Sequence, residues 1–171
     1  QDVRPWIELH NREFGPYPVF LGGVSMGATT VLMAAGTPLP DNVRGILADC
    51  GFSSPREILT SVAKHRAHLP AFPILYLANF WCRLLAGFDW MENSTVQAMA
   101  RNRLPVFFAH GQADDFVPWS MTQAAYDAAA CDKQLLLVPG AGHGRSYLVE
   151  RERYLHMLED FLNRNLPASS T

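Results

Sequence analysis

The chain has 171 residues, 49% of them hydrophobic and 18% charged, which is enough apolar material for one domain with its own core. Its 14 basic and 16 acidic side chains give a net charge of -2, and the arginines are spread along the chain, so nothing in the composition supports binding of nucleic acid or a polybasic membrane anchor. No apolar run reaches the roughly 18 residues of a membrane span, so we expect no transmembrane segment in this chain.

The first part of the chain is predicted to alternate helices with short buried strands. Residues 2–14 have the apolar spacing of an amphipathic helix, which a Gly-Pro-Tyr-Pro turn ends. Residues 19–21 and 43–48 are apolar runs typical of buried strands, and a helix is expected over 28–35 between them. Strands that are apolar throughout and alternate with helices predict a parallel sheet with helices on both faces.

Residues 53–103 carry no convincing strand and are predicted to form a helical insertion between two strands of the sheet. A Ser-Ser-Pro start favours a helix from residue 55 to about residue 69. Residues 74–86 are apolar almost all round, which predicts a helix that is buried or in contact with an apolar partner. A last short helix is expected to follow a Ser-Thr cap and to end at Arg101.

The last third returns to the alternating pattern. Strands are predicted over residues 106–109 and 134–138, with a helix over 119–130 between them. A long amphipathic helix is expected over residues 147–165, and it would close the fold against the sheet.

Residues that could ligate a metal do not form a convincing site. His65 and His68 stand three residues apart, but with no carboxylate or third ligand nearby we expect them to face solvent. Cys50, Cys82 and Cys131 lack metal-ligand spacing and form an odd set, which favours reduced, buried thiols over a disulfide framework. We therefore expect no metal.

The stretch Gly23-Val24-Ser25-Met26-Gly27 is the feature around which the chain is organised. It fits G-x-S-x-G and lies between a predicted strand and a predicted helix, the context in which that motif exposes a nucleophilic serine. The turn is sharp, so we expect Gly23 and Gly27 to be required because side chains there would clash. The Met26 N–H would then face an oxyanion at the start of the helix.

Ser25, Asp114 and His143 are each predicted to follow the carboxyl end of a different strand. In open α/β sheets, ligands bind at that edge. A serine hydroxyl needs a base to take its proton, histidine can take and return it near neutral pH, and a carboxylate can orient the imidazole and stabilise its cation. The three residue types therefore predict nucleophile, base and acid in the chain order Ser, Asp, His.

These motifs together resemble the α/β-hydrolase superfamily, which has the same chain order. Residues 23–27 resemble its nucleophile elbow, residues 110–118 its acid loop H-G-x-x-D-x-x-V-P, and Gly142-His143-Gly144 its histidine loop. Residues 48–55 and the helical insertion are similar to bacterial serine hydrolases with a small cap. The resemblance implies an α/β fold with a mostly parallel sheet, helices on both faces and a short helical cap insertion over residues 53–103.

The chain also departs from the family pattern. Members have several strands before the elbow, and a loop among those strands supplies a second oxyanion N–H. We therefore expect residues 1–171 to be a single-domain fragment that lacks the N-terminal strands. An open sheet edge at residues 19–21 would favour self-association, and the fragment alone would be a poor catalyst. A cytoplasmic location is expected, with an upstream signal or anchor left open.

Two other carboxylates compete with Asp114 for the role of the acid. Asp49 follows the preceding strand, where some family members place their acid, but Asp114 matches the usual position and is preferred. Asp49 would then cap or brace the loop that carries Phe52. Asp115 is expected to be a solvated loop carboxylate.

The function predicted from these residues is cofactor-free hydrolysis of a carboxylic ester, thioester or amide through an acyl-enzyme. Peptidase, thioesterase and acyltransferase activities would use the same three residues, and a non-catalytic binding protein that retains the fold is the alternative from another class. The substrate is expected to be a small acyl compound. Its predicted contacts are Phe52, Phe80, Trp81 and Phe116.

Overall fold

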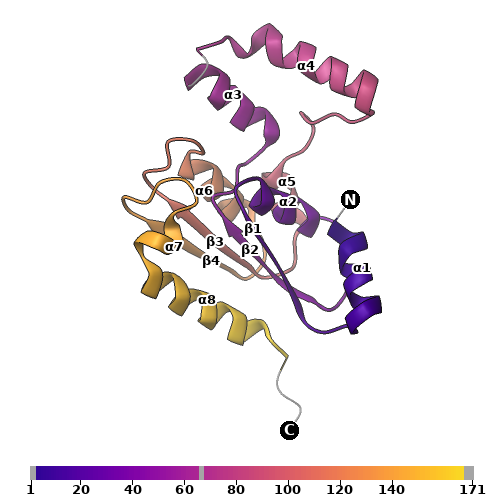
Figure 1. Ribbon diagram of the computed structural model, residues 1–171, viewed down its shortest axis with the longest axis vertical. Coiled ribbons are helices and arrows are strands. Elements are labelled where there is room, and N and C mark those ends of the chain that lie inside the picture. Colours follow the sequence, from indigo (N-terminus) through magenta and orange to yellow (C-terminus); the bar gives the residue numbers. More distant parts are fainter. Residues whose placement is uncertain (1–2, 66–67, 168–171) are drawn as a thin grey trace.

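The computed structural model describes residues 3–65 and 68–167, and it is built around one parallel sheet with the strand order β1-β2-β3-β4. Each strand pairs in parallel with the next one along the chain (Figure 1). The strands are β1 (Val19–Val24), β2 (Val43–Asp49), β3 (Val106–Gly111) and β4 (Lys133–Val138). The predicted α/β class with a parallel sheet is confirmed.

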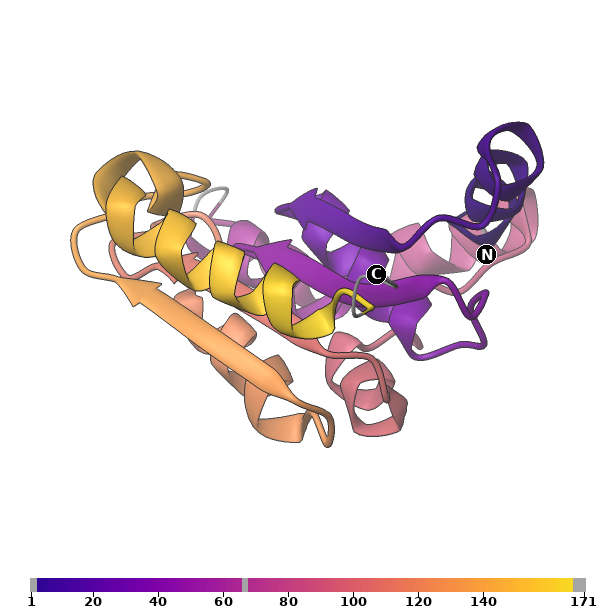
Figure 2. The same ribbon diagram turned by 90° about the horizontal axis from the view of Figure 1, so that it is seen from below.

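Both faces of the sheet are covered, because successive side chains of a strand point to opposite faces. On one face, Phe108 of β3 lies in a core with side chains of α2 (Met26–Ala35), α5 (Thr95–Arg101) and α6 (Trp119–Ala128). On the other face, the adjacent Phe107 packs against Phe161 of α8 (Arg151–Asn165), which runs along the sheet in Figure 2. The fully apolar strand β3 is therefore buried from both sides.

Two helix boundaries near the carboxyl edge of the sheet differ from those predicted. Helix α2 begins at Met26, directly after Ser25, rather than two residues later. The single closing helix predicted over residues 147–165 is two helices, α7 (Ser146–Val149) and α8, because Glu150 between them has a non-helical backbone with φ -124° and ψ 58°. The side chain of Ser146 is buried against the sheet edge, which gives α7 a direction separate from that of α8.

The insertion between β2 and β3 divides into two parts. Helices α3 (Pro55–His65) and α4 (Ala71–Ala86) form a hairpin that stands away from the sheet, whereas α5 packs on α2 and α6 (Figure 1). Residue 69, the predicted end of α3, lies beyond the helix, and residues 66–67 and the side chain of His65 lie outside the described structure. His68 is exposed.

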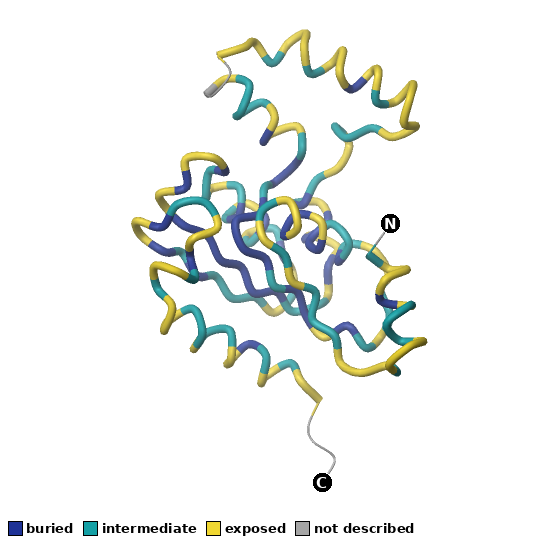
Figure 3. The backbone as a smooth tube through the Cα atoms, viewed as in Figure 1, coloured by how far each residue is buried: buried dark blue, intermediate teal, exposed yellow. Residues whose placement is uncertain are grey.

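Helix α4 is mostly exposed, so the prediction of a buried helix over residues 74–86 is wrong (Figure 3). Its inner positions, Leu75, Asn79 and Cys82, are partly or fully buried. Its outer side chains are large, apolar and open to solvent: Phe72, Ile74, Tyr76, Leu77, Phe80, Trp81, Leu84 and Leu85. The prediction that this helix contacts an apolar partner stays a prediction.

Strand β1 is an outer strand of the described sheet and pairs only with β2 there. Self-association through this edge, which the apolar run predicts, stays a prediction. Helix α1 (Val3–Phe14) precedes β1, and the side chains of Asn11 and Asn42 are hydrogen-bonded to each other. Within residues 3–65 and 68–167, no helix has the length and apolar character needed to cross a bilayer.

Candidate active site

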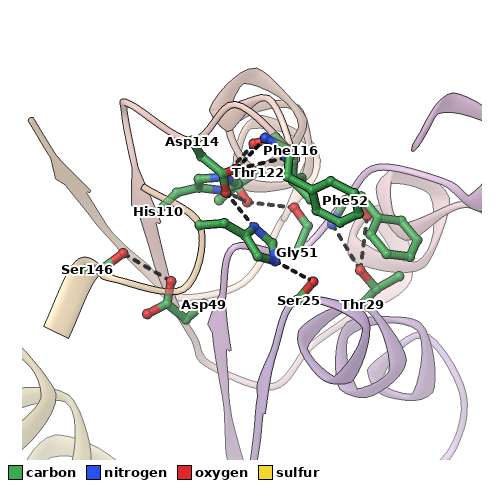
Figure 4. A network of polar contacts seen from close by, with 12 residues as sticks. Ser25, Thr29, Asp49, Gly51, Phe52, His110, Asp114, Phe116, Thr122 and Ser146 are labelled. Atoms are coloured by element: carbon green, nitrogen blue, oxygen red, sulfur yellow. Dashed lines mark hydrogen bonds and ion pairs between the residues drawn. The ribbon is translucent and has the colours of Figure 1, made fainter. Parts of the chain in front are cut away.

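Ser25, His143 and Asp114 come together at the carboxyl edge of the sheet (Figure 4). Ser25 Oγ lies 2.9 Å from His143 Nε2, and His143 Nδ1 lies 2.7 Å from Asp114 Oδ2. The three residues follow β1, β4 and β3, so the contact joins parts of the chain 118 and 29 residues apart. This line of hydrogen bonds can pass the serine proton to the imidazole.

The turn that carries Ser25 has the strained backbone expected of an elbow. Ser25 has a φ of 56°, in the left-handed region that non-glycine residues rarely adopt. A Cβ on Gly23 would overlap the backbone of Gly27 and Ala28, so glycine is required there. Gly27 itself has open space around its Cβ position, and the expectation that it relieves a clash is wrong. Gly27 is exposed, and its Cβ position points away from Gly23, although its backbone lies against Gly23.

This difference between the two glycines predicts different effects of the same substitution. Gly23→Ala should reduce soluble expression and the melting temperature sharply, because backbone atoms cannot move aside as a flexible side chain can. Gly27→Ala should leave the melting temperature within a few degrees of wild type, since alanine favours a helix interior over glycine. Thermal melts of the two purified variants test this, and equal stabilities would contradict it.

Backbone contacts fix the position of the elbow relative to β2. The Ser25 amide donates to the carbonyl of Asp49 at 2.8 Å, and the Ser25 carbonyl accepts from Thr29 at 3.0 Å. Met26 is the first residue of α2, where amides have no acceptor within the helix. The role of its N–H as an oxyanion donor stays a prediction. The Phe52 amide donates to Thr29 Oγ1 at 2.9 Å and is already in use.

Asp114 is held by the loop that follows β3. Its Oδ1 accepts hydrogen bonds from the amides of Phe116 and Val117, both at 2.9 Å, and its Oδ2 faces His143. Burial raises the pKa of Asp114, but the Val117 amide, His143 and the Phe116 amide outweigh it, so the net pKa is below the usual value. Asp114 is therefore ionised near neutral pH and can stabilise an imidazolium.

The loop that carries His143 is fastened to the acid loop. The Ala113 amide donates to the Ala141 carbonyl at 2.9 Å, and a Cβ on Gly111 would overlap that same carbonyl. The ring of Phe116 meets the His143 imidazole edge to face, with centroids 5.1 Å apart. These contacts limit the positions that the imidazole can adopt between Ser25 and Asp114.

Asp49 has other partners and is not hydrogen-bonded to His143 in the described structure. It is buried, its Oδ1 accepts from Ser146 Oγ at 3.1 Å, and the Tyr154 hydroxyl donates to it. In Figure 4 the Asp49–Ser146 pair lies apart from Asp114. The carboxylate therefore braces α7, rather than the loop of Phe52 as expected, while its backbone carbonyl supports the elbow.

The buried Asp49 carboxylate predicts an unusual pH dependence of stability. Burial raises its pKa above the ordinary value of 3.8, so the folded chain binds this proton more tightly than the unfolded chain. Ionisation then costs stability as the pH rises through the raised pKa. Asp49→Asn removes this cost, and the melting temperature of the variant relative to wild type should rise from pH 4 to pH 8.

The control for that prediction is Asp41→Asn, which removes an exposed carboxylate from a loop. Melting temperatures of the three proteins across the pH range provide the measurement. A difference between Asp49→Asn and wild type that shrinks as the pH rises would contradict the predicted sign.

The four predicted substrate contacts have different positions. Phe116 touches His143, and Phe52 lies in the β2–α3 loop, where its carbonyl accepts from Thr95 Oγ1 at 2.8 Å. Phe80 and Trp81 lie on the outer side of α4, 58% and 53% exposed, with their rings 5.6 Å apart. No hydrogen bond or ring contact in the described residues joins these two to the triad of Ser25, His143 and Asp114.

Three buried side chains, His110, Thr122 and Cys50, have contacts around the acid that the sequence did not predict. His110 lies between Asp114 and Thr122. It is the first residue of the acid-loop motif over residues 110–118, and that motif alone did not indicate these contacts. Cys50 has a φ of 49°, and its sulfur lies within 4.8 Å of ligand atoms of Asp114 and His143. Burial raises the pKa of Cys50 to about 12, so its thiol is protonated at neutral pH.

The chain is similar in sequence or fold to several known proteins. No protein-family model matches the chain. The uncharacterized protein YqkD of Bacillus subtilis is 32% identical over 141 residues, which cover 82% of this chain and 46% of YqkD. The chain spans about half the length of the curated relatives it matches.

Two solved structures have similar folds. The Pyrococcus furiosus esterase Pf2001 superimposes with a TM-score of 0.71 and 18% identity, over 97% of this chain and 61% of the esterase. A Paleococcus ferrophilus monoacylglycerol lipase superimposes with a TM-score of 0.62 and 19% identity, over 95% of this chain and 74% of the lipase. At these identities the likeness concerns the fold.

Proposed function

This chain has the α/β-hydrolase fold, and from that premise we propose that it is part of a serine hydrolase that cleaves a carboxylic ester through an acyl-enzyme. The observation that carries the proposal is the hydrogen-bonded line from Ser25 through His143 to Asp114, with contacts of 2.9 and 2.7 Å. An esterase, a monoacylglycerol lipase and an acylaminoacyl peptidase are among the similar structures, so an ester is the first substrate class to test and an amide the second.

Each residue has one role in the proposed reaction. Ser25 Oγ attacks the acyl carbon while His143 Nε2, 2.9 Å away, takes the hydroxyl proton. Asp114 keeps the remaining imidazole proton on Nδ1 and stabilises the cation that forms. The proton then passes to the leaving alcohol, and a water deprotonated by His143 releases the acid from Ser25. The Met26 N–H stabilises the oxyanion during both formation and hydrolysis of the acyl-enzyme.

The experiment that tests this proposal is covalent labelling with a fluorophosphonate probe, which reacts only with an activated serine. In the longer protein that carries residues 1–171 together with its natural upstream sequence, we expect one equivalent of label per chain, located on Ser25 by peptide mass spectrometry. A folded protein that is not labelled would contradict the proposal and favour a binding protein that retains the fold. A labelled protein that transfers its acyl group to an added alcohol faster than to water would be an acyltransferase.

The exposed aromatic pair on α4 is proposed to contact the acyl group. Trp81→Ala and Phe80→Ala should change the ratio of kcat/KM between short and medium p-nitrophenyl esters. Each methylene contact in an apolar pocket is worth about 1–3 kcal/mol. Trp6→Ala, which truncates an exposed tryptophan on α1, is the matched control and should leave the ratio unchanged. If the α4 variants behave like the control, α4 does not contact the acyl group.

A further inference from the structure

His110 is a buried histidine beside the acid with no role in the proposed reaction. It stands in β3, four residues before Asp114, and neither of the two side chains exposes any surface to solvent. Its Nε2 lies 3.1 Å from Asp114 Oδ2 and 3.0 Å from the Val117 carbonyl. Its Nδ1 lies 2.7 Å from Thr122 Oγ1 of α6.

The two neighbours of Nε2 decide where its hydrogen lies. A carbonyl can only accept, and Asp114 is ionised and can only accept as well. An unprotonated Nε2 would place three lone pairs against one another in a buried site. Nε2 therefore carries a hydrogen, which it shares between the carboxylate and the Val117 carbonyl. Burial lowers the pKa of His110, and the Val117 carbonyl and Asp114 act in the opposite direction.

A second set of contacts, at Nδ1, fixes the orientation of the His110 imidazole ring. With the imidazole hydrogen on Nε2, Nδ1 can only accept, so the single Thr122 hydrogen lies between Nδ1 at 2.7 Å and the Gly51 carbonyl at 2.9 Å. Gly51 directly follows Cys50 at the end of β2. The ring of His110 is thus tied to β2, α6 and the acid loop at once (Figure 4).

The carboxylate of Asp114 consequently has no freedom to turn. Its Oδ1 accepts two amides, and its Oδ2 accepts from His143 at 2.7 Å and from His110 at 3.1 Å. These four bonds occupy the four lone-pair directions of the group. Without His110, Oδ2 would keep one donor, and the carboxylate could rotate about its Cβ–Cγ bond away from His143.

We propose that His110 is a positioning residue for the acid, which uses its Nε2–H to hold Asp114 Oδ2 against His143 Nδ1. This inference rests on the proposed serine-hydrolase function. It predicts that His110 acts on the chemical step rather than on substrate affinity. A misplacement of about 1 Å in a catalytic group can cost about 10²-fold in rate.

Two substitutions separate the Nε2 donor from the bulk of the side chain. In His110→Gln the amide nitrogen stands near the former Nε2, whereas in His110→Asn it stands near the former Nδ1. Glutamine should preserve kcat for p-nitrophenyl butyrate within a few-fold, and asparagine should lower kcat by about 10²-fold with KM unchanged. The rate of fluorophosphonate labelling should follow the same order.

Phe108→Leu serves as the control, since it trims a buried side chain of β3 on the α2 face and should lower the melting temperature without lowering kcat. If His110→Asn does not fold, Thr122→Val and Thr122→Ser replace it, and only the valine variant, which lacks the hydroxyl, should lose kcat. Equal kcat in both members of either pair would overturn the inference. A wild-type protein that the probe does not label would instead overturn the proposed function.

Discussion

Replacing Ser25 by alanine is expected to abolish labelling by a fluorophosphonate and to lower kcat/KM for p-nitrophenyl esters by at least about 10³-fold. Ser25 Oγ is the atom that would bond to the acyl carbon. It lies 2.9 Å from His143 Nε2, which could take its proton and so make it reactive. His143→Ala should have nearly the same effect, because nucleophile and base act as one unit and removal of either removes the covalent route. The double variant should therefore be little worse than either single one.

The control for these two variants must keep the fold of the elbow. Ser146→Ala removes another buried hydroxyl at the same sheet edge, one bonded to Asp49 rather than to His143, and it should keep most of the activity. Matching melting temperatures would show that the losses in the site variants are chemical. A Ser25→Ala protein that hydrolyses the ester at the wild-type rate would show that another group is the nucleophile.

The meeting of Ser25, Asp114 and His143 could be predicted because it depends on regular features. Each residue follows an apolar strand, and parallel strands bring their carboxyl ends to one edge whatever the details of packing. The elbow could also be predicted at Gly23, where the close approach of strand and helix excludes a Cβ. The open space at the Cβ position of Gly27 could not be predicted, because it depends on the tertiary structure around the turn.

The roles of His110 and Asp49 could not be predicted from the sequence pattern. His110 depends on Thr122 and Gly51, which are 12 residues after it and 59 residues before it in the chain. Asp49 depends on Ser146, 97 residues away, and on a break in the closing helix that no glycine or proline marks. Both side chains are buried polar groups whose partners are set by tertiary packing.

Helix α4 shows where hydrophobic periodicity misleads. An apolar stretch is expected to be buried, because burial removes its surface from water. Here only one side of the helix packs against α3, and the outer side, including Leu84 and Leu85, is exposed. The pattern records that an apolar surface exists, but it does not identify what covers that surface.

Asp114→Asn is expected to lower kcat by about 10⁴-fold, as loss of the orienting carboxylate does where the imidazole depends on it. An asparagine amide at the former Oδ2 would donate toward His143 Nδ1, which favours the wrong tautomer and leaves Nε2 protonated beside Ser25. If the amide instead turns its oxygen to His143, its NH₂ group meets the donating amides of Phe116 and Val117. Neither orientation satisfies both sets of partners.

Asp49→Asn provides the matched comparison, since it makes the same chemical change at the neighbouring buried carboxylate. Its side-chain oxygen can still accept from Ser146, and no hydrogen bond joins this residue to His143 in the described structure. We expect it to retain kcat within about 10-fold of wild type, since backbone support of the elbow by the Asp49 carbonyl is unchanged. A larger loss of kcat in Asp49→Asn than in Asp114→Asn would mean that the acid lies at the end of β2.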